Sequence, residues 1–205
     1  RISEENQQIP YAERKLWTSC WLVDPLDGTK EFSKRNGECT VNSALGEHGK
    51  PIVGVIYVPV SRELYYGETV TKRAYKTVVG NDHQPLGPLF ESTDRIGAAD
   101  KPANVLRVVG SRSHMNRDTE LFMEEMKSQF NEIEILSKGS SLKFCMVAEG
   151  KAHVYPRFAP TMEWDTAAGS AIAEAVGLSV ISRNTQESLM YNKENLLNPY
   201  FLVSL

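Results

Sequence analysis

The chain has 205 residues, of which 41% are hydrophobic and 24% are charged, and this balance excludes a disordered or fibrous protein. At this length it should fold as one large domain or as two closely joined halves, because a domain usually has about 100–200 residues. A net charge of −3 and the lack of any apolar run near roughly 20 residues argue against a nucleic acid polymer as partner and against a transmembrane segment.

The start of the chain and its cysteines suggest where the protein works. Because the chain begins at Arg1 in a polar run without a methionine, we expect further residues ahead of it. Cys20, Cys39 and Cys145 are an odd number without CxxC spacing, which is typical of reduced thiols. We therefore expect a cytoplasmic protein, with a peripheral position at the inner face of the membrane as the alternative.

The first half of the chain is rich in short apolar runs. Residues 21–23 precede Asp24-Pro25, and because proline cannot donate to a strand ladder, we predict a strand that stops there. Residues 40–45 and 52–58 predict two strands joined by a glycine- and proline-containing hairpin loop, and residues 63–66 a third. The pattern indicates an antiparallel meander.

Residues 80–103 are rich in Pro, Gly and Asp, and we interpret them as a connection, with a short strand inside it as an option. The spacing of apolar residues changes after this stretch. Strand-like runs then alternate with helix-like runs, which predicts a mixed sheet covered by helices. The predicted strands are 105–109, 133–136, 152–157, 179–182 and 201–205, and the predicted helices are 116–130, 140–149 and 165–176. We place the two halves at residues 1–103 and 104–205.

An acidic turn follows the first predicted strand. Asp24 and Asp27 lie three residues apart, and Gly28 lets the backbone come close to a ligand. Carboxylates are the ligands that Mg²⁺ prefers, and the Leu26 carbonyl and the Thr29 hydroxyl could add further oxygens. Taken alone, however, Asp, Pro and Gly also form ordinary turns.

Asp165 stands at the start of an apolar helical pattern. Its simplest role is an N-cap that accepts hydrogen bonds from the first turn. The small residues Ala167, Ala168 and Gly169 indicate that this end of the helix packs closely against another element. Spacing alone does not connect Asp165 with the acidic turn.

The motif Trp-Leu-Val-Asp-Pro-Leu-Asp-Gly-Thr-Lys-Glu-Phe at residues 21–32, followed by Trp-Asp-Thr-Ala-Ala-Gly at residues 164–169, resembles the two signatures of the inositol monophosphatase superfamily. Within that superfamily the chain is similar to the CysQ-type 3′(2′),5′-bisphosphate nucleotidases. Further similar segments are residues 30–32, 34–38, 110–114, 139–144 and 155–158. The resemblance implies an α+β fold, a layered α/β/α/β/α sandwich, and a magnesium-dependent, lithium-inhibited phosphatase.

The resemblance also implies a metal site for two or three Mg²⁺ ions. Glu4 would share a metal with the attacking water, Asp24 would bridge two metals, and the Thr29 hydroxyl would orient the water. These three residues are the expected catalytic set. The implied metal ligands are Glu4, Asp24, the Leu26 carbonyl, Asp27 and Asp165, and Gly28 and Thr29 would hold the phosphate through their backbone amides.

The segments of the second half would hold a nucleotide. His114, Ser140, Lys143 and Arg157 resemble the family's substrate contacts, since Lys and Arg are the usual donors to a phosphate that does not react. The alternative is that Lys143 and Arg157 are surface charges and that His114 is structural. The full set of expected substrate-binding residues is Glu4, Leu26, Asp27, Gly28, Thr29, His114, Ser140, Lys143, Arg157 and Asp165.

We therefore expect an enzyme that hydrolyses the 3′-phosphate of adenosine 3′,5′-bisphosphate to AMP and phosphate in sulfur metabolism. The alternatives are an inositol or sugar monophosphatase and a catalytically silent relative that binds nucleotide. Family members begin with roughly two helices that carry an acidic residue supporting Thr29, so we expect such a segment ahead of Arg1. The oligomeric state is left open.

Overall fold

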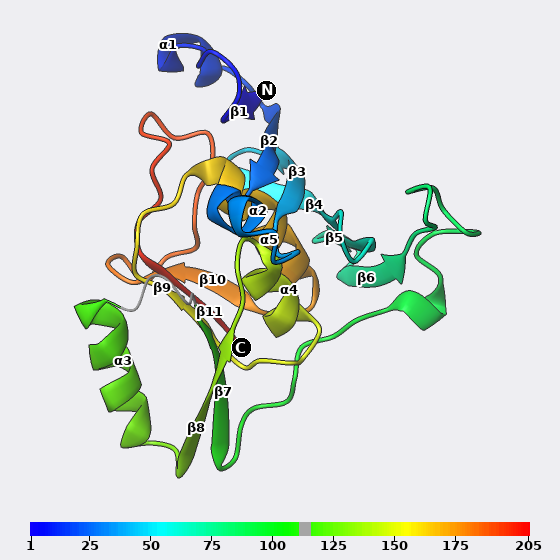
Figure 1. Ribbon diagram of the computed structural model, residues 1–205. Coiled ribbons are helices and arrows are strands. Elements are labelled where there is room, and N and C mark those ends of the chain that lie inside the picture. The colour runs from blue at the N-terminus through cyan, green and yellow to red at the C-terminus, as the bar shows by residue number, and fades with distance from the viewer. Residues whose placement is uncertain (111–115) are drawn as a thin grey trace.

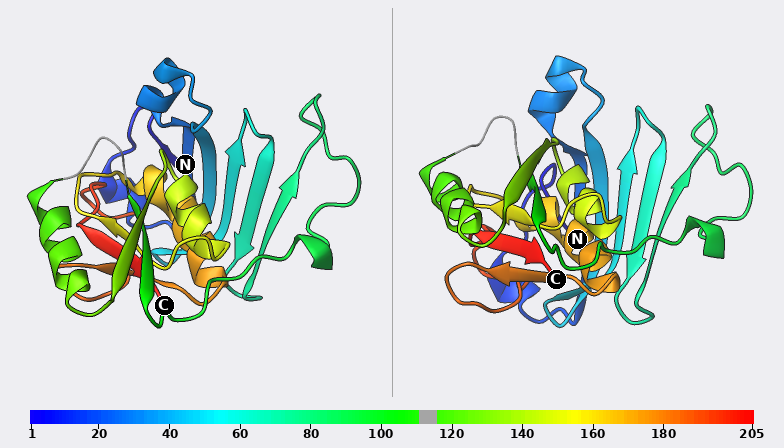
Figure 2. Two further views of the ribbon diagram at one scale, coloured as in Figure 1. Left: turned by 60° about the horizontal axis from the view of Figure 1, so that its bottom comes forward. Right: turned by 90° about the horizontal axis from the view of Figure 1, so that it is seen from below.

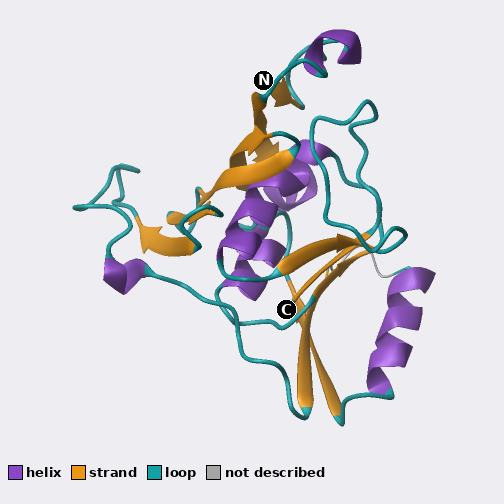
Figure 3. Cartoon of the chain, turned by 180° about the vertical axis from the view of Figure 1, so that it is seen from behind, coloured by secondary structure: helices purple, strands orange, loops and turns teal. Residues whose placement is uncertain are grey.

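A computed structural model describes residues 1–110 and 116–205 of the chain. These residues form layers that Figures 1 and 2 show in order: a large sheet, a pair of helices, a second set of strands and an outer helix. The view from behind in Figure 3 shows the same helix pair between the two groups of strands. The predicted α+β sandwich is confirmed.

The first sheet contains six strands that lie side by side in chain order. All neighbours are antiparallel except the first pair, in which Ile2 and Ser3 run parallel to Leu22 and Val23. The predicted meander is confirmed, but the sequence pattern missed the first and last strands. The strands are β1 (Ile2–Ser3), β2 (Ser19–Asp27), β3 (Thr40–Glu47), β4 (Lys50–Val58), β5 (Glu63–Glu68) and β6 (Arg73–Val78).

The prediction that the strand stops at Asp24-Pro25 is wrong. β2 continues to Asp27, and its pairing with β3 shifts between Asp24 and Asp27. At such an irregularity the ladder is interrupted, so Pro25 is tolerated although it has no N–H to donate.

β3 and β4 form the predicted hairpin with a shorter connection than expected. The strands extend until only His48 and Gly49 remain between them, with φ values of 49° and 77°. Two residues with positive φ are typical of the turns whose twist matches a hairpin.

Residues 80–103 contain no strand, so the optional strand inside them is wrong. They hold one 3₁₀ turn, η1 (Ser92–Asp94), and a single bridge between Tyr75 and Arg95. Phe90 stacks on Tyr66 with ring centroids 4.7 Å apart. This contact attaches the connection to the first sheet.

The described residues of the second half form five strands and three helices close to the predicted positions. β9, β10 and β11 form an antiparallel group, and β7 and β8 a parallel pair. A parallel bridge between Val108 and Val154 joins the two groups into the expected mixed arrangement. The elements are β7 (Val105–Gly110), α3 (Arg117–Lys127), β8 (Glu132–Ser137), α4 (Leu142–Ala148), β9 (Tyr155–Arg157), α5 (Glu163–Ala175), β10 (Ser179–Ser182) and β11 (Phe201–Ser204), and two short helices, α1 (Tyr11–Arg14) and α2 (Thr29–Lys34), lie in the first half.

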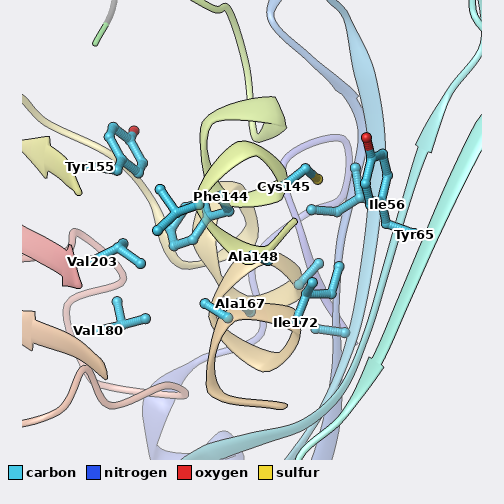
Figure 4. Close-up of a cluster of buried hydrophobic side chains, with 14 of the residues drawn as sticks. Ile56, Tyr65, Phe144, Cys145, Ala148, Tyr155, Ala167, Ile172, Val180 and Val203 are labelled. Atoms are coloured by element: carbon cyan, nitrogen blue, oxygen red, sulfur yellow. The ribbon is translucent and has the colours of Figure 1, made fainter. Parts of the chain in front are cut away.

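The helices α4 and α5 are the centre of the hydrophobic core (Figure 4). On one side, Ile172 of α5 lies toward Ile56 and Tyr65 of the first sheet, all nearly inaccessible to solvent. On the other side, Phe144 of α4 stacks on Phe201 with ring centroids 5.7 Å apart. One helix layer thus buries apolar side chains of both sheets, as a layered domain requires.

Small residues let α5 approach its neighbours closely, as the sequence pattern predicted. A Cβ atom added to Gly54 of β4 would lie 2.2 Å from the backbone oxygen of Ala168, and one added to Gly169 would lie 2.3 Å from the Phe144 ring. At Gly67 of β5 the nearest atom would be Cα of Ile172 at 2.6 Å. The depth at which α5 sits against the sheet therefore depends on glycine.

The opposite face of the first sheet is more accessible. Its strands alternate between buried and half-exposed residues, and the half-exposed set includes Val41, Leu45, Val53 and Val55. Trp21 is 49% exposed. In the described ranges 1–110 and 116–205, no helix is both long and apolar enough to cross a bilayer.

We predict that Gly54→Ala destabilises the protein by about 2–3 kcal/mol, because the added methyl group collides with the backbone of α5, which cannot rotate away. Gly97→Ala is the control, since a Cβ atom at Gly97 would meet nothing within 4 Å. Urea denaturation of both variants measures the free energy of unfolding. Equal stability of the two variants would contradict the close approach of β4 and α5.

Candidate active site

Three carboxylates from distant parts of the sequence meet between the first sheet and α5. Asp24 and Asp27 lie on β2, and Asp165 lies in the first turn of α5. Each offers an oxygen atom, and these atoms all lie within 4.8 Å of one another. The tertiary structure thus joins the two acidic motifs that spacing alone could not connect.

The end of β2 is shaped by a local hydrogen bond, and the turn after it by one glycine. The backbone N–H of Leu26 donates to Oδ1 of Asp24 at 2.9 Å. Gly28 has a φ of +86°, and a Cβ atom there would lie 3.1 Å from Cβ of Ser140. Glycine suits both the left-handed backbone and the close approach, and the next residue, Thr29, begins α2.

Asp165 occupies a different position in the helix from the one its motif suggested. α5 begins at Glu163 and Met162 is the N-cap residue, so the interpretation of Asp165 as N-cap is wrong. Its Oδ2 instead accepts a hydrogen bond from the backbone N–H of Met162 at 2.8 Å. One oxygen of Asp165 therefore caps the helix from within its first turn.

Glu163 holds the start of α5 in place. Its side chain is completely buried and accepts hydrogen bonds from the backbone N–H groups of Asn192 at 2.6 Å and Lys193 at 3.0 Å. The ammonium group of Lys193 lies 2.5 Å from the same carboxylate. Nothing in the sequence marks Glu163 as important, because burial of a charged residue leaves no signal in spacing.

Burial raises the pKa values of the three aspartates, and repulsion adds to the shift at Asp24 and Asp165. Burial, followed by the charge of Asp27, raises the pKa of Asp24 to about 7 and that of Asp165 to about 7. Burial also raises the pKa of Asp27, although nearby Lys143 opposes the shift. A divalent cation bound by these oxygens would favour their ionised forms, so the donor set fits a hard cation such as Mg²⁺.

A pocket of about 260 Å³ opens over the three aspartates. It contains every expected site residue that the structure describes, whereas His114 lies outside the described residues. The predicted residues that line it are Glu4, Asp24, Leu26, Asp27, Gly28, Thr29, Ser140, Lys143, Arg157 and Asp165. Glu4 is exposed and lies outside the close trio of aspartates.

Several lining residues were not expected. Ser141, Tyr155 and Thr166 fall inside segments that resemble the family, so their motifs could have indicated them, whereas nothing in the sequence pattern marked Thr161.

Lys143 is not a surface charge, so that alternative is wrong. It is 4% exposed, its Nζ donates to the Ser140 carbonyl at 2.6 Å, and it lies 5.5 Å from the centroid of the Tyr155 ring. Burial lowers the pKa of Lys143 to about 8, with Asp27 opposing the shift and Arg157 adding to it. A buried lysine beside a second cation is well suited to an anionic ligand.

Arg157 also presents an available donor near the pocket. Its Nη2 donates to the Pro160 carbonyl at 3.1 Å. Its Nε is buried, and none of the described residues accepts a hydrogen bond from it. A buried donor of this kind normally finds a partner in the functional complex.

The sequence profile of the Inositol monophosphatase family matches residues 1–200. The chain belongs to the inositol monophosphatase family. It is 47% identical over 204 residues to the 3′(2′),5′-bisphosphate nucleotidase CysQ of Escherichia coli K12, a match that spans 100% of this chain and 75% of the relative. The corresponding protein of Haemophilus influenzae is 31% identical over 98% of this chain and 70% of its own length.

Solved structures of the family agree with the fold. A crystal structure of CysQ from Bacteroides thetaiotaomicron superimposes with a TM-score of 0.88 at 50% identity, over 99% of this chain and 75% of that one. The inositol monophosphatase SaIMPase-II, bound to inositol monophosphate, gives a TM-score of 0.72 at 20% identity, over 99% and 70% of the two chains. The second match supports the fold alone.

We predict that Mg²⁺ stabilises the protein more at pH 8 than at pH 6. In the folded protein the pKa values of Asp24 and Asp165 are about 7, above the usual 3.8. Without metal, the contribution of these two groups to the free energy of unfolding is therefore lost as the pH rises from about 4 to 7. Mg²⁺ binds only the ionised carboxylates and reverses this loss. Thermal unfolding with and without Mg²⁺ at the two pH values measures the difference, and an equal rise in Tm at both would contradict the prediction.

Proposed function

We propose that this chain hydrolyses the 3′-phosphate of adenosine 3′,5′-bisphosphate to give AMP and phosphate. The observation that carries the proposal is the meeting of Asp24, Asp27 and Asp165 in one pocket, in a chain 47% identical over its whole length to a bisphosphate nucleotidase. The substrate is a small-molecule nucleotide, and the reaction removes a by-product of sulfur metabolism.

We propose that the pocket holds two or three Mg²⁺ ions. Asp24, Asp27, Asp165, Glu4 and the Leu26 carbonyl would supply the oxygen ligands, and all five residues line the pocket. When bound, such ions lower the pKa of a water molecule and stabilise the attacking and leaving oxygens of phosphoryl transfer.

The residues at the rim of the pocket would position the water. Glu4 would accept a hydrogen bond from it through its carboxylate, and the Thr29 hydroxyl would hold it in line with the phosphorus atom. The backbone amides of Gly28 and Thr29 would face the phosphate oxygens, an arrangement that the left-handed conformation of Gly28 supports. Positioning of this kind accounts for a large part of catalysis.

The cationic side of the pocket would bind the part of the nucleotide that does not react. Lys143 and Arg157 would contact the 5′-phosphate, and the Ser140 hydroxyl, which donates to the Glu38 carbonyl at 2.5 Å, would help to place the loop. The buried, unpaired Nε of Arg157 supports this assignment. His114 is proposed as a further contact from the resemblance alone.

We further propose a cytoplasmic location, which the unpaired Cys20, Cys39 and Cys145 support. No feature of the described residues favours the alternative position at the membrane.

Phosphate release tests the proposed reaction. We expect rapid release from adenosine 3′,5′-bisphosphate, slower release from inositol 1-phosphate, loss of activity without Mg²⁺ and inhibition by Li⁺. Asp165→Asn keeps the volume but removes a charge, so activity should fall by about 100-fold or more. Asp100→Asn, at an exposed position of the connection, is the control.

The same assay separates the alternatives. Preference for inositol 1-phosphate would favour the inositol or sugar monophosphatase. Nucleotide binding without turnover would indicate the silent relative, and full activity of Asp165→Asn would remove that residue from the site.

We predict that Lys143→Ala raises the KM for adenosine 3′,5′-bisphosphate about 10-fold while lowering kcat less, because a contact to the second phosphate contributes equally before and during the reaction. Turnover of a small monophosphate should change less. Lys127→Ala, at an exposed position on α3, is the control. Equal losses on both substrates would show that Lys143 supports the scaffold instead.

A further inference from the structure

One oxygen of Asp27 is surrounded by hydrogen-bond donors. Its Oδ2 accepts from the backbone N–H of Ser141 at 2.6 Å, from the Thr40 hydroxyl at 3.3 Å and from Nδ2 of Asn42 at 3.3 Å. In the ranges that the structure describes, no group donates to the other oxygen, Oδ1. The two oxygens of this carboxylate therefore have different surroundings.

The three donors are also bonded to one another. The Ser141 hydroxyl donates to Oδ1 of Asn42 at 2.8 Å, which leaves the amide nitrogen of Asn42 directed at Asp27. The hydroxyls of Thr40 and Ser141 lie 2.8 Å apart and are hydrogen-bonded to each other. All three side chains are at most 2% exposed, and a buried network of this kind holds its members in one arrangement.

The network joins the two halves of the molecule. Thr40 and Asn42 lie on β3, where they pair with Asp27 and Asp24 of β2. Ser141 is the N-cap residue of α4. The orientation of the Asp27 carboxylate thus depends on the contact between the first sheet and the start of α4.

We propose that Thr40, Asn42 and Ser141 are positioning residues that hold Oδ2 of Asp27 and leave Oδ1 as the oxygen that binds the cation. This inference rests on the proposed metal-dependent function. Hydrogen bonds to a ligating carboxylate fix its orientation, and their loss typically weakens metal binding about 10–100-fold.

The experiment measures Mg²⁺ binding to the metal-free protein by calorimetry, without substrate. Thr40→Val keeps the shape of the side chain and removes the hydroxyl, and we expect it to weaken Mg²⁺ binding about 10-fold. Thr40→Ser keeps the hydroxyl and should bind nearly as the unmodified protein does. Thr119→Val is the matched control, because Thr119 is a buried threonine whose hydroxyl donates to Asn116 at 2.8 Å on the outer helix.

A second variant tests the proposal independently in case Thr40→Val fails to fold. Ser141→Ala retains the backbone N–H that donates to Asp27, but it removes the hydroxyl that holds the Asn42 amide in place. We therefore expect it to weaken Mg²⁺ binding as well. Because the hydroxyls of Thr40 and Ser141 are in contact, the losses in the double variant should not be additive. Thermal unfolding without metal identifies any variant that fails to fold.

Normal Mg²⁺ affinity in folded Thr40→Val and Ser141→Ala, with Mg²⁺-dependent hydrolysis by the unmodified protein, would overturn the positioning role and leave the proposed function standing. An affinity of Thr40→Ser as low as that of Thr40→Val would overturn it as well. If the unmodified protein neither binds Mg²⁺ nor releases phosphate, the proposed function fails and the positioning role fails with it.

Discussion

The repulsion among three carboxylates is the constraint around which this structure is organised. Asp24, Asp27 and Asp165 place oxygen atoms within 4.8 Å of one another in a partly buried pocket. Burial disfavours the ionised state of all three, and the charge of Asp27 adds to this effect at Asp24 and Asp165, which is why their pKa values rise. Such an arrangement persists only where the surrounding structure holds it, and its oxygen atoms could bind a multivalent cation.

The scaffold resists this repulsion at both ends of the site. Gly54 and Gly169 allow α5 to lie directly against β4 and α4, so the helix that carries Asp165 cannot easily move outward. At its start, the fully buried Glu163 is bonded to the backbone of Asn192 and Lys193. Close packing and buried hydrogen bonds both make displacement costly.

The loop residues Asn192 and Lys193, which hold the start of α5, also bind the N-terminal segment at Arg14. Arg14, 3% exposed, donates to the Asn192 side chain at 2.7 Å and to the Lys193 carbonyl at 3.1 Å. Asn192 and Lys193 therefore contact both Arg14 and Glu163. Arg14 of the N-terminal segment and the start of the helix that carries Asp165 thus share one support.

The sequence alone predicted most of the strands and helices of this protein and its family. Alternating apolar residues and glycine-marked turns located most strands and helices, because such patterns report local periodicity. The two motifs at residues 21–32 and 164–169 indicated the family and its phosphatase chemistry, since their order and composition are specific. Two statements stay predictions: the boundary between the halves after residue 103, and the individual roles of the site residues.

Only the tertiary structure decided how the site is assembled. Three features depend on residues far apart in the chain: the shifted pairing that carries β2 past Pro25, the burial of Lys143 and Glu163, and the network of Thr40, Asn42 and Ser141 around Asp27. Periodicity describes which face of an element is apolar, but it carries no information about which distant donor reaches a given carboxylate. For that reason the candidate ligands could be named from their motifs, whereas their orientation required the packing of α4 and α5 between the sheets.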